Sequence, residues 1–349
     1  MSTAWFSKAL LPWYREHQRP LPWRQNADPY HIWLSEVILQ QTRVDQGAAY
    51  WHRFTERYPD VQSLAKAPEE EVLRLWQGLG YYSRARNLRT AAQQVIELHQ
   101  GRFPPSYPAL KALKGVGEYT AAAIGSIAFG LPEPVVDGNV YRVLSRVFGI
   151  ATPIDSTAGK KEFRALAEDL LDRSNPGDHN QAVMELGALV CTPKNPRCGD
   201  CPLARRCLAL RTDRIGELPV KATRTTVRER YFNYLHIVDK SGLYLRKRQG
   251  KDIWQGLFEL PLVESPRALK DARFAKALHQ EFGAGWTITN RHGPIKHVLS
   301  HQIIHAYFWE VKRPNTFKVP KDWIAVAPDE LDRYALPRLI DRYLREGHR

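Results

Sequence analysis

All four cysteines of this 349-residue chain lie between residues 191 and 207. Their spacing is Cys191-x6-Cys198-x2-Cys201-x5-Cys207. The N-terminus lacks an apolar core followed by a small-residue cleavage site, so disulfides are disfavoured. Four thiolates without an intervening histidine satisfy either tetrahedral zinc or a [4Fe–4S] cubane. The spacing alone predicts a metal or iron–sulfur site and does not separate the two.

Glu36 is a candidate general acid. Its neighbours at helical spacing, Ile32, Trp33 and Leu39, are apolar, so the carboxyl would lie on an apolar face. Burial disfavours the ionised form and would raise the pKa toward neutral pH, as a general acid requires. A partly exposed helix carboxylate is the alternative, and spacing alone favours that alternative.

Asp137 is a candidate anion. It precedes a helical repeat over 138–144, where Asp is a common N-cap. A helix N-terminus favours the ionised form, and one raised carboxyl beside one ionised carboxylate is typical of an acid and anion pair. About a hundred residues separate Asp137 from Glu36, so the sequence alone does not place them together.

Gly115 and Gly117 flank a single apolar residue just before a helical run that starts at Glu118. This pattern predicts a tight turn whose backbone N–H groups, beside a helix N-terminus, could hold a phosphate oxygen. A single G-x-G is a weak signal, and a bare turn is its commoner meaning.

The elements that must position these residues change in kind along the chain. Apolar residues over 1–190 recur at spacings of three and four, with Gly and Pro between the runs, which predicts an all-helical region. The expected helices cover 30–42, 69–76, 84–99, 118–130, 139–148, 160–172 and 179–190. After a polar, basic stretch, alternating runs predict a hairpin of 231–238 with 243–245. Further strands are expected at 295–299 and 303–311 and a helix at 266–282, which indicates an α+β domain.

The positive charge is concentrated in one segment. The chain has 51 Lys and Arg against 37 Asp and Glu, a net +14, and residues 201–250 hold +8 of it. Such a segment is typical of a phosphate-contacting surface, although a solvated Arg-rich linker explains the charge about as well. An apolar content of 43% excludes disorder as the main state, and no run approaches the length of a membrane span. A soluble intracellular protein is therefore expected.

The cysteine spacing, following a helical region, is similar to the cluster loop of the endonuclease III superfamily of DNA glycosylases. The turn at 115–117 resembles the helix-hairpin-helix of that superfamily, with Lys114 in place of the usual proline. Four strings are similar to those of MutY-type adenine DNA glycosylases: LSEVILQQT at 34–42, GLGYY at 78–82, GVGEYT at 115–120 and DGNV at 137–140. The resemblance implies a [4Fe–4S] cluster held by Cys191, Cys198, Cys201 and Cys207. It also implies that Lys194 and Arg197 face DNA phosphates, with an ordinary solvated loop as the alternative.

The same resemblance implies a reaction. Enzymes of this family remove adenine mispaired with 8-oxoguanine, and the base must leave the duplex stack to be reached. Glu36 would protonate adenine at N7. Asp137 would stabilise the oxocarbenium ion or form a transient adduct, as the second carboxylate does in retaining glycosidases. Tyr119 and Asn139 would position these groups.

Three further positions bear on DNA contact and on strand cleavage. By resemblance, Gln41 and Tyr81 would enter the duplex near the lesion; a helix-terminal amide and a core aromatic are the alternatives. Bifunctional relatives place a lysine nucleophile just after the hairpin, where this chain has Tyr119. Because a phenol forms no Schiff base, base excision without efficient strand cleavage is expected.

The C-terminal region has a resemblance of its own. The stretch WQGLFELP at 254–261 and the helix ending at EFG, 281–283, look like a nudix fold. The hydrolase signature is broken, because 277–281 lacks the acidic set that holds Mg²⁺, so a binding domain is expected. Family members recognise 8-oxoguanine through a Phe-Ser-His loop, which is matched here by Leu299, Ser300 and His301. Leucine in place of the aromatic weakens a stacking role, and a merely polar strand edge is the alternative.

These observations predict a multidomain protein in which an all-α helix-hairpin-helix glycosylase domain precedes an α+β nudix-like domain. The expected boundaries are 1–212 for the first domain, including the cluster loop at 191–207, 213–229 for a linker, and 230–349 for the second domain. The expected partner is double-stranded DNA with A:8-oxoguanine or A:G mispairs. A monomer is expected, in the cytoplasm or at a bacterial nucleoid, and no membrane contact. The alternatives are an endonuclease III-like glycosylase and lyase for oxidised pyrimidines, or a non-catalytic iron–sulfur DNA-binding protein.

Overall fold

The computed structural model describes residues 4–223 and 227–347 and divides into two compact units. Unit 1 comprises Met1–Lys66 with Asn87–Arg224, and unit 2 comprises Ala67–Arg86 with Thr225–Arg349. The sequence analysis expected 1–212 to form one domain, whereas residues 67–86 group with the C-terminal segment.

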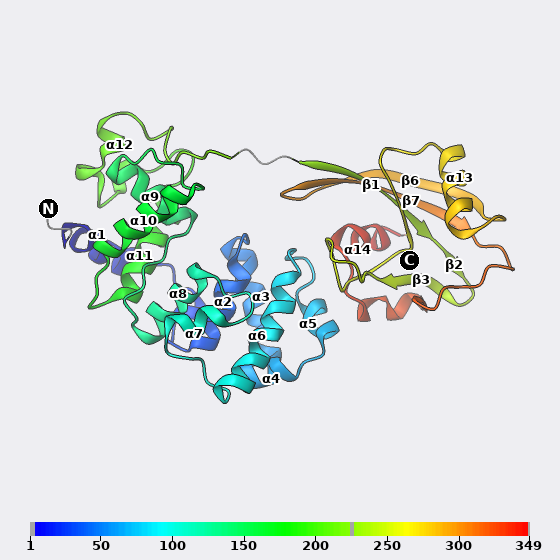
Figure 1. Ribbon diagram of the computed structural model, residues 1–349, viewed down its shortest axis with the longest axis horizontal. Helices are drawn as coiled ribbons and strands as arrows, with labels where there is room; N and C mark the ends of the chain where they lie inside the picture. The colour runs from blue at the N-terminus through cyan, green and yellow to red at the C-terminus, as the bar shows by residue number, and fades with distance from the viewer. Residues whose placement is uncertain (1–3, 224–226, 348–349) are drawn as a thin grey trace. The chain divides into compact units, whose positions relative to one another are not determined.

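The chain up to residue 211 forms helices without a strand in its described part (Figure 1). In chain order they are α1 (Ala4–His17), α2 (Pro29–Leu39), α3 (Val44–Arg57), α4 (Val61–Lys66), α5 (Glu69–Leu75), α6 (Ser83–His99), α7 (Tyr107–Ala112), α8 (Glu118–Phe129), α9 (Gly138–Phe148), α10 (Thr157–Leu170), α11 (Pro176–Leu189) and α12 (Leu208–Arg211). Every helix that the sequence analysis named in this region is present, with ends shifted by a few residues. The all-helical class is confirmed.

Helix ends in unit 1 follow from local sequence. The Asp28 side chain caps α2 by accepting a hydrogen bond from the Tyr30 backbone N–H, with proline in the first helical position. At the other end, α8 and α9 stop at Gly130 and Gly149, which have φ of +64° and +67°. Glycine adopts this left-handed conformation without a steric penalty.

The core of unit 1 beside the cysteine loop is formed by α1, α9, α10 and α11. Leu10, Phe163 and Leu186 are fully buried there, and Leu203 and Cys207 belong to the same cluster. The segment predicted as a linker is partly folded onto this unit, because Asp155 accepts hydrogen bonds of 2.8 Å from the backbone N–H groups of Ala222 and Thr223.

Unit 2 contains two small sheets and two helices besides α5. The strands are β1 (Arg228–His236), β2 (Val238–Asp239), β3 (Gly242–Lys247), β4 (Phe258–Glu259), β5 (Leu262–Ser265), β6 (Thr287–Val298), β7 (Gln302–Lys312) and β8 (Trp323–Val326), and the helices are α13 (Asp271–Phe282) and α14 (Arg338–Arg345). One sheet has the order β5-β1-β7-β6; in the other, β2, β3 and β4 follow one another and β8 also pairs with β3.

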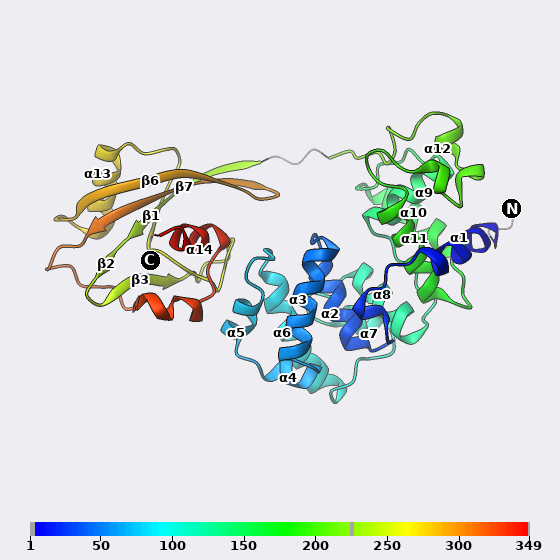
Figure 2. The ribbon, with the colours of Figure 1, turned by 180° about the vertical axis from the view of Figure 1, so that it is seen from behind.

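Helices cover both faces of the first sheet. Phe308 and Trp309 are adjacent in β7, so their side chains point to opposite faces. Trp309 stacks on Phe274 of α13 and Phe308 on Tyr343 of α14, at ring-centre distances of 3.9 and 3.8 Å. Figures 1 and 2 show the two helices on either side of this sheet. The α+β class is confirmed.

The predicted hairpin of 231–238 with 243–245 is wrong in its pairing. Only Val238 and Asp239 pair with β3, whereas β1 lies between β5 and β7 in the other sheet. Both faces of the β1 sheet are covered, so β1 is buried along most of its length. An apolar sequence pattern of this kind predicts a buried strand but does not identify the strand with which it pairs. The turn at 239–242 is where the sequence placed it. Among the described residues, no helix has the length and apolar character to cross a membrane.

Candidate functional site

A pocket of about 550 Å³ in unit 1 brings together the residues that the sequence analysis proposed for catalysis. Its lining includes Glu36 of α2, Tyr119 of α8, and Asp137 and Asn139 at the start of α9, together with Gln41 just after α2. The fold thus provides the proximity that sequence spacing could not supply.

Glu36 is a buried carboxyl of this pocket, with 9% of its surface exposed. The Tyr119 hydroxyl donates a hydrogen bond of 2.6 Å to Glu36 Oε2. Burial raises the pKa of Glu36 to about 7; the hydrogen bond from Tyr119 opposes that rise and the charge of Asp137 adds to it. Glu36 therefore exchanges a proton near neutral pH, as expected from its apolar helix face.

Asp137 caps α9. Its Oδ1 accepts from the backbone N–H groups of Asn139 and Val140, at 2.9 and 2.8 Å, and its Oδ2 accepts from Asn139 Nδ2 at 2.8 Å. The expected cap is confirmed, but the expected effect on ionisation is wrong in direction. Burial raises the pKa of Asp137 above its ordinary value, and the cap hydrogen bonds lower it only in part.

A chain of hydrogen bonds runs from this cap to the cysteine loop. Arg142 donates from Nη2 to Asn139 Oδ1 and to the Gly187 carbonyl, both at 2.8 Å, and from Nε to the Cys191 carbonyl at 2.6 Å. Gly187 permits the close approach, because a Cβ there would lie 2.6 Å from the Asn139 Cβ. The Asp137 cap and the first cysteine are therefore linked through one guanidinium.

Three charged residues of the pocket were missed by the sequence analysis: Arg19, Arg24 and Glu185. Arg19 pairs with Glu185 through two side-chain hydrogen bonds of 2.8 Å, and Arg24 donates to the same carboxylate at 2.9 Å. Burial alone would raise the pKa of Glu185, but the hydrogen bonds and charges of Arg19 and Arg24 lower it to about 2. A charged residue among the apolar positions of 179–190 was the available signal.

The four cysteines line one small apolar cavity together with Arg146. Arg146 Nη1 lies 3.4 Å from Cys191 Sγ, and the Cys207 thiol donates to the Arg146 carbonyl. Within 4–223 and 227–347, no three Cys, His, Asp or Glu side chains are grouped closely enough to hold a single metal ion. The four thiols thus share one cavity, a donor set that could hold an iron–sulfur cluster.

The proposed phosphate contacts lie on turns and loops of unit 1. Gly115 has φ of +77°, and a Cβ there would lie 2.7 Å from the Asn87 Cβ, so the turn requires glycine. Gly117 occupies the N-cap of α8, as expected. Lys194 and Arg197 are exposed, and Arg197 donates to the Leu189 carbonyl at 3.1 Å. Phosphate binding by these groups stays a prediction.

Two residues predicted for lesion contact meet within unit 2. Tyr81 and Ser300 share a hydrogen bond between their hydroxyl groups. Both line a cavity of about 460 Å³, which also includes Trp254, His297 and His301. Tyr81 has φ of +46° and is 45% exposed, so it is not the core aromatic that the alternative interpretation required.

Comparison with known proteins gives three matches to family models. Residues 34–172 match the HhH-GPD superfamily base excision DNA repair protein, residues 191–207 match the iron–sulfur binding domain of endonuclease III, and residues 233–346 match the NUDIX domain. An adenine DNA glycosylase of Buchnera aphidicola (strain Sg) is 35% identical over 257 residues, which cover 73% of this chain and 74% of that protein. The chain belongs to the adenine DNA glycosylase family.

Two other proteins are similar to parts of this chain. The human adenine DNA glycosylase is 47% identical over 213 residues, which cover 58% of this chain but only 39% of the human protein. A solved structure described as a thermostable thymine-DNA glycosylase covers 60% of this chain and 97% of its own, with 30% identity and a TM-score of 0.56. Family membership confirms the resemblance, and the match over 191–207 confirms the iron–sulfur cofactor.

Replacement of Glu36 by glutamine should stabilise unit 1 at high pH. The pKa of Glu36 is about 7 in the fold against an ordinary 4.5, so the folded state holds the proton more tightly and stability falls as pH rises from about 5 to 7. Glu36→Gln removes this loss. The gain in free energy of unfolding should be near zero at pH 4 and on the order of 3 kcal/mol at pH 8. Hydrogen exchange of the α2 amides measures it. The exposed Glu97→Gln is the control, and an equal gain at both pH values would contradict the prediction.

Replacement of Cys198 by serine should remove the cluster. One lost thiolate leaves an incomplete ligand set, so Cys198→Ser should lose bound iron and its visible absorbance, and amides of 191–207 should exchange faster. Thr192→Ala in the same loop is the control and should keep its iron. Iron analysis and absorption spectra measure both variants. Zinc in the wild-type protein, or full iron in Cys198→Ser, would show that the ligand assignment is wrong.

Proposed function

We propose that this chain removes adenine from mispairs in double-stranded DNA by hydrolysing the N-glycosidic bond. The observation that carries the proposal is the buried Glu36, with a pKa near 7, in one pocket with Asp137 in a member of the adenine DNA glycosylase family. The proposal extends to the opposite base, 8-oxoguanine or guanine. We also propose that the protein acts as a monomer in the compartment that holds the DNA.

The pocket supplies a general acid and a group that stabilises a cation. Adenine rotates out of the stack into the pocket, where protonated Glu36 donates to N7 and makes the base a better leaving group. Tyr119, hydrogen-bonded to Glu36, orients the carboxyl. As the C–N bond breaks, Asp137 faces the positive charge that develops on the sugar, and Glu36 accepts a proton from the attacking water.

The walls of the pocket would orient the base. The cluster of Arg19, Arg24 and Glu185 is polar, with Glu185 buried and both arginines partly exposed, so it offers hydrogen bonds to an adenine edge. Because a buried polar group left without its partner costs about 1–3 kcal/mol, such a cluster discriminates against bases that do not pair with it. The three residues are proposed as base-orienting groups.

Contacts to the DNA come from other parts of the chain. Backbone N–H groups at 115–117 and the side chains of Lys194 and Arg197 would bind phosphates. Gln41, which has φ of +55° at the mouth of the pocket, would enter the space that the base leaves. Tyr81, Ser300 and His301 would contact the opposite base. Tyr119, in the position of the lysine nucleophile of lyases, forms no Schiff base.

Single-turnover incubation with defined duplexes tests the proposal. Adenine opposite 8-oxoguanine or guanine should be released, with strand breaks only after alkali. A duplex with thymine opposite guanine tests the alternative of a thymine-DNA glycosylase. A duplex with thymine glycol opposite adenine tests the alternative of a lyase. Strand breakage at thymine glycol without alkali, or faster release of thymine than of adenine, would refute it. Glu36→Gln should retain DNA binding and lose release of adenine by a factor of 100 or more, on the order of what general acids contribute.

The pH dependence of adenine release should follow Glu36. The acid is active while protonated, so the single-turnover rate should fall as pH rises through about 7. Tyr119→Phe removes a hydrogen bond that lowers the pKa of Glu36, so the falling limb should move to higher pH. Tyr141→Phe, whose ring packs on Phe163, is the control and should leave the limb in place. If the falling limb of the pH–rate curve of Tyr119→Phe is unchanged or lies at lower pH, the proton-donor role of Glu36 is contradicted.

A further inference from the structure

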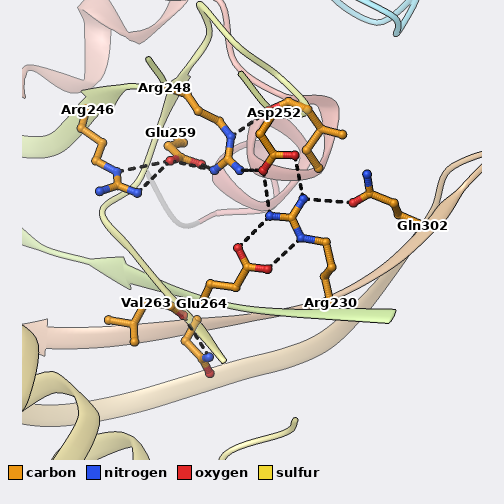
Figure 3. A network of polar contacts seen from close by, with 10 residues as sticks. Arg230, Arg246, Arg248, Asp252, Glu259, Val263, Glu264 and Gln302 are labelled. Carbon is orange, nitrogen blue, oxygen red and sulfur yellow. Dashed lines mark hydrogen bonds and ion pairs between the residues drawn. The ribbon is translucent and has the colours of Figure 1, made fainter. Parts of the chain in front are cut away.

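Arg230 of β1 is a buried guanidinium in the middle of a polar network in unit 2 (Figure 3). It donates to Glu264 from Nε and Nη2, both at 2.7 Å, and to Asp252 from Nη1 and Nη2, at 2.9 and 2.7 Å. Nη1 also donates to Gln302 Oε1 at 3.0 Å. All five N–H groups of Arg230 are used. A planar guanidinium whose N–H groups are all hydrogen-bonded can take only one orientation. Arg230 therefore fixes its three partners relative to one another.

One partner of Arg230, Gln302, ends the turn that carries the proposed lesion contacts. Gln302 begins β7, and its carbonyl accepts a hydrogen bond of 2.8 Å from the Leu299 N–H, which closes the turn around Ser300 and His301. The backbone N–H of Arg228 donates to the His301 carbonyl at 3.0 Å. Strand β1 therefore holds the turn twice, by its backbone at Arg228 and by the side chain of Arg230.

Another partner of Arg230, Asp252, begins a loop that lines the cavity beside Ser300. Residues 252–255 and 297–302 both line this cavity of about 460 Å³. In the loop, Trp254 adopts φ of +60°, an unusual conformation for a tryptophan. Its ring packs edge-on against His297, at a ring-centre distance of 5.7 Å. Arg230 thus joins the loop that presents Trp254 to the turn that presents Ser300.

We propose that Arg230 is a positioning residue for recognition of the base opposite the adenine. It sets the distance between the 252–255 loop and the 299–302 turn, and so the width of the cavity that would receive that base. This inference rests on the proposed function of the turn. It assigns no chemistry to Arg230 itself, whose guanidinium is saturated by protein partners and lies in a different unit from Glu36.

Two substitutions test the proposal in the full-length protein with its cluster. Arg230→Lys keeps the charge but cannot bond two carboxylates and an amide in one plane. Gln302→Leu removes the side-chain link between Arg230 and the turn and leaves both ion pairs in place, so it keeps the test valid if Arg230→Lys folds poorly. Single-turnover adenine release is measured against enzyme concentration on duplexes with adenine opposite 8-oxoguanine and opposite guanine, which gives a maximal rate and a half-saturating concentration for each.

Both variants should raise the half-saturating concentration for the 8-oxoguanine duplex by about threefold to tenfold, the range for one lost hydrogen bond. The guanine duplex should change by less, and the maximal rate should stay near that of the wild type. Arg246→Lys is the matched control, since Arg246 bonds Glu259 in the same network without touching the turn.

Equal weakening on both duplexes, a fall in maximal rate alone, or no change would overturn the proposal. The same loss of preference in Arg246→Lys would also overturn it, because the effect would then belong to the network in general. A wild-type protein without preference between the duplexes overturns both this proposal and the lesion-reading part of the proposed function. A preference that both variants retain overturns this proposal alone.

Discussion

The burial of Glu36 is the constraint on which the candidate active site depends. A carboxyl removed from water favours its protonated form, and here the shift brings the pKa to about 7. The surrounding helices must hold this group without a full counter-charge, because a close ion pair would lower the pKa again. Tyr119 supplies a neutral hydrogen bond in place of a cation. The nearby Arg19 and Arg24 bind Glu185 instead. The pocket therefore holds Glu36, which can be protonated near neutral pH, beside Glu185, which stays ionised.

The position of Asp137 depends in turn on where α9 begins. Because the Asp137 side chain caps the helix, a shift of the first turn would move the carboxylate as well. Asn139 and Arg142 extend the cap to the backbone of Cys191. The cysteine loop is packed on the same core through Leu203 and Cys207. A cluster that orders the loop thereby also limits the movement of the Asp137 carboxylate, which gives a structural reason for a cofactor at this position.

The sequence predicted what depends on local pattern. The helix face of Glu36, the cap at Asp137, the glycine turn at 115–117 and the cysteine window all follow from neighbours in the chain. Properties that depend on tertiary packing were missed. The pKa of Asp137 rises because α9 begins inside a buried pocket, and the expected effect of a helix N-terminus assumes exposure to solvent. Glu185 meets Arg19 across 166 residues, and the partner of β1 is set by sheet packing.

The arginine network of unit 2 engages three carboxylates of this nudix-like unit. A nucleotide hydrolase needs carboxylates that are free to bind Mg²⁺. In this chain Glu259 accepts from Arg246 and Arg248, while Asp252 and Glu264 accept from Arg230. Each carboxylate of the network is thus already neutralised by a guanidinium. Bidentate Arg–carboxylate pairs are geometrically specific, whereas a catalytic metal site must exchange ligands during turnover. The acids of this network, Asp252, Glu259 and Glu264, instead connect strands and the 252–255 loop through their arginine partners.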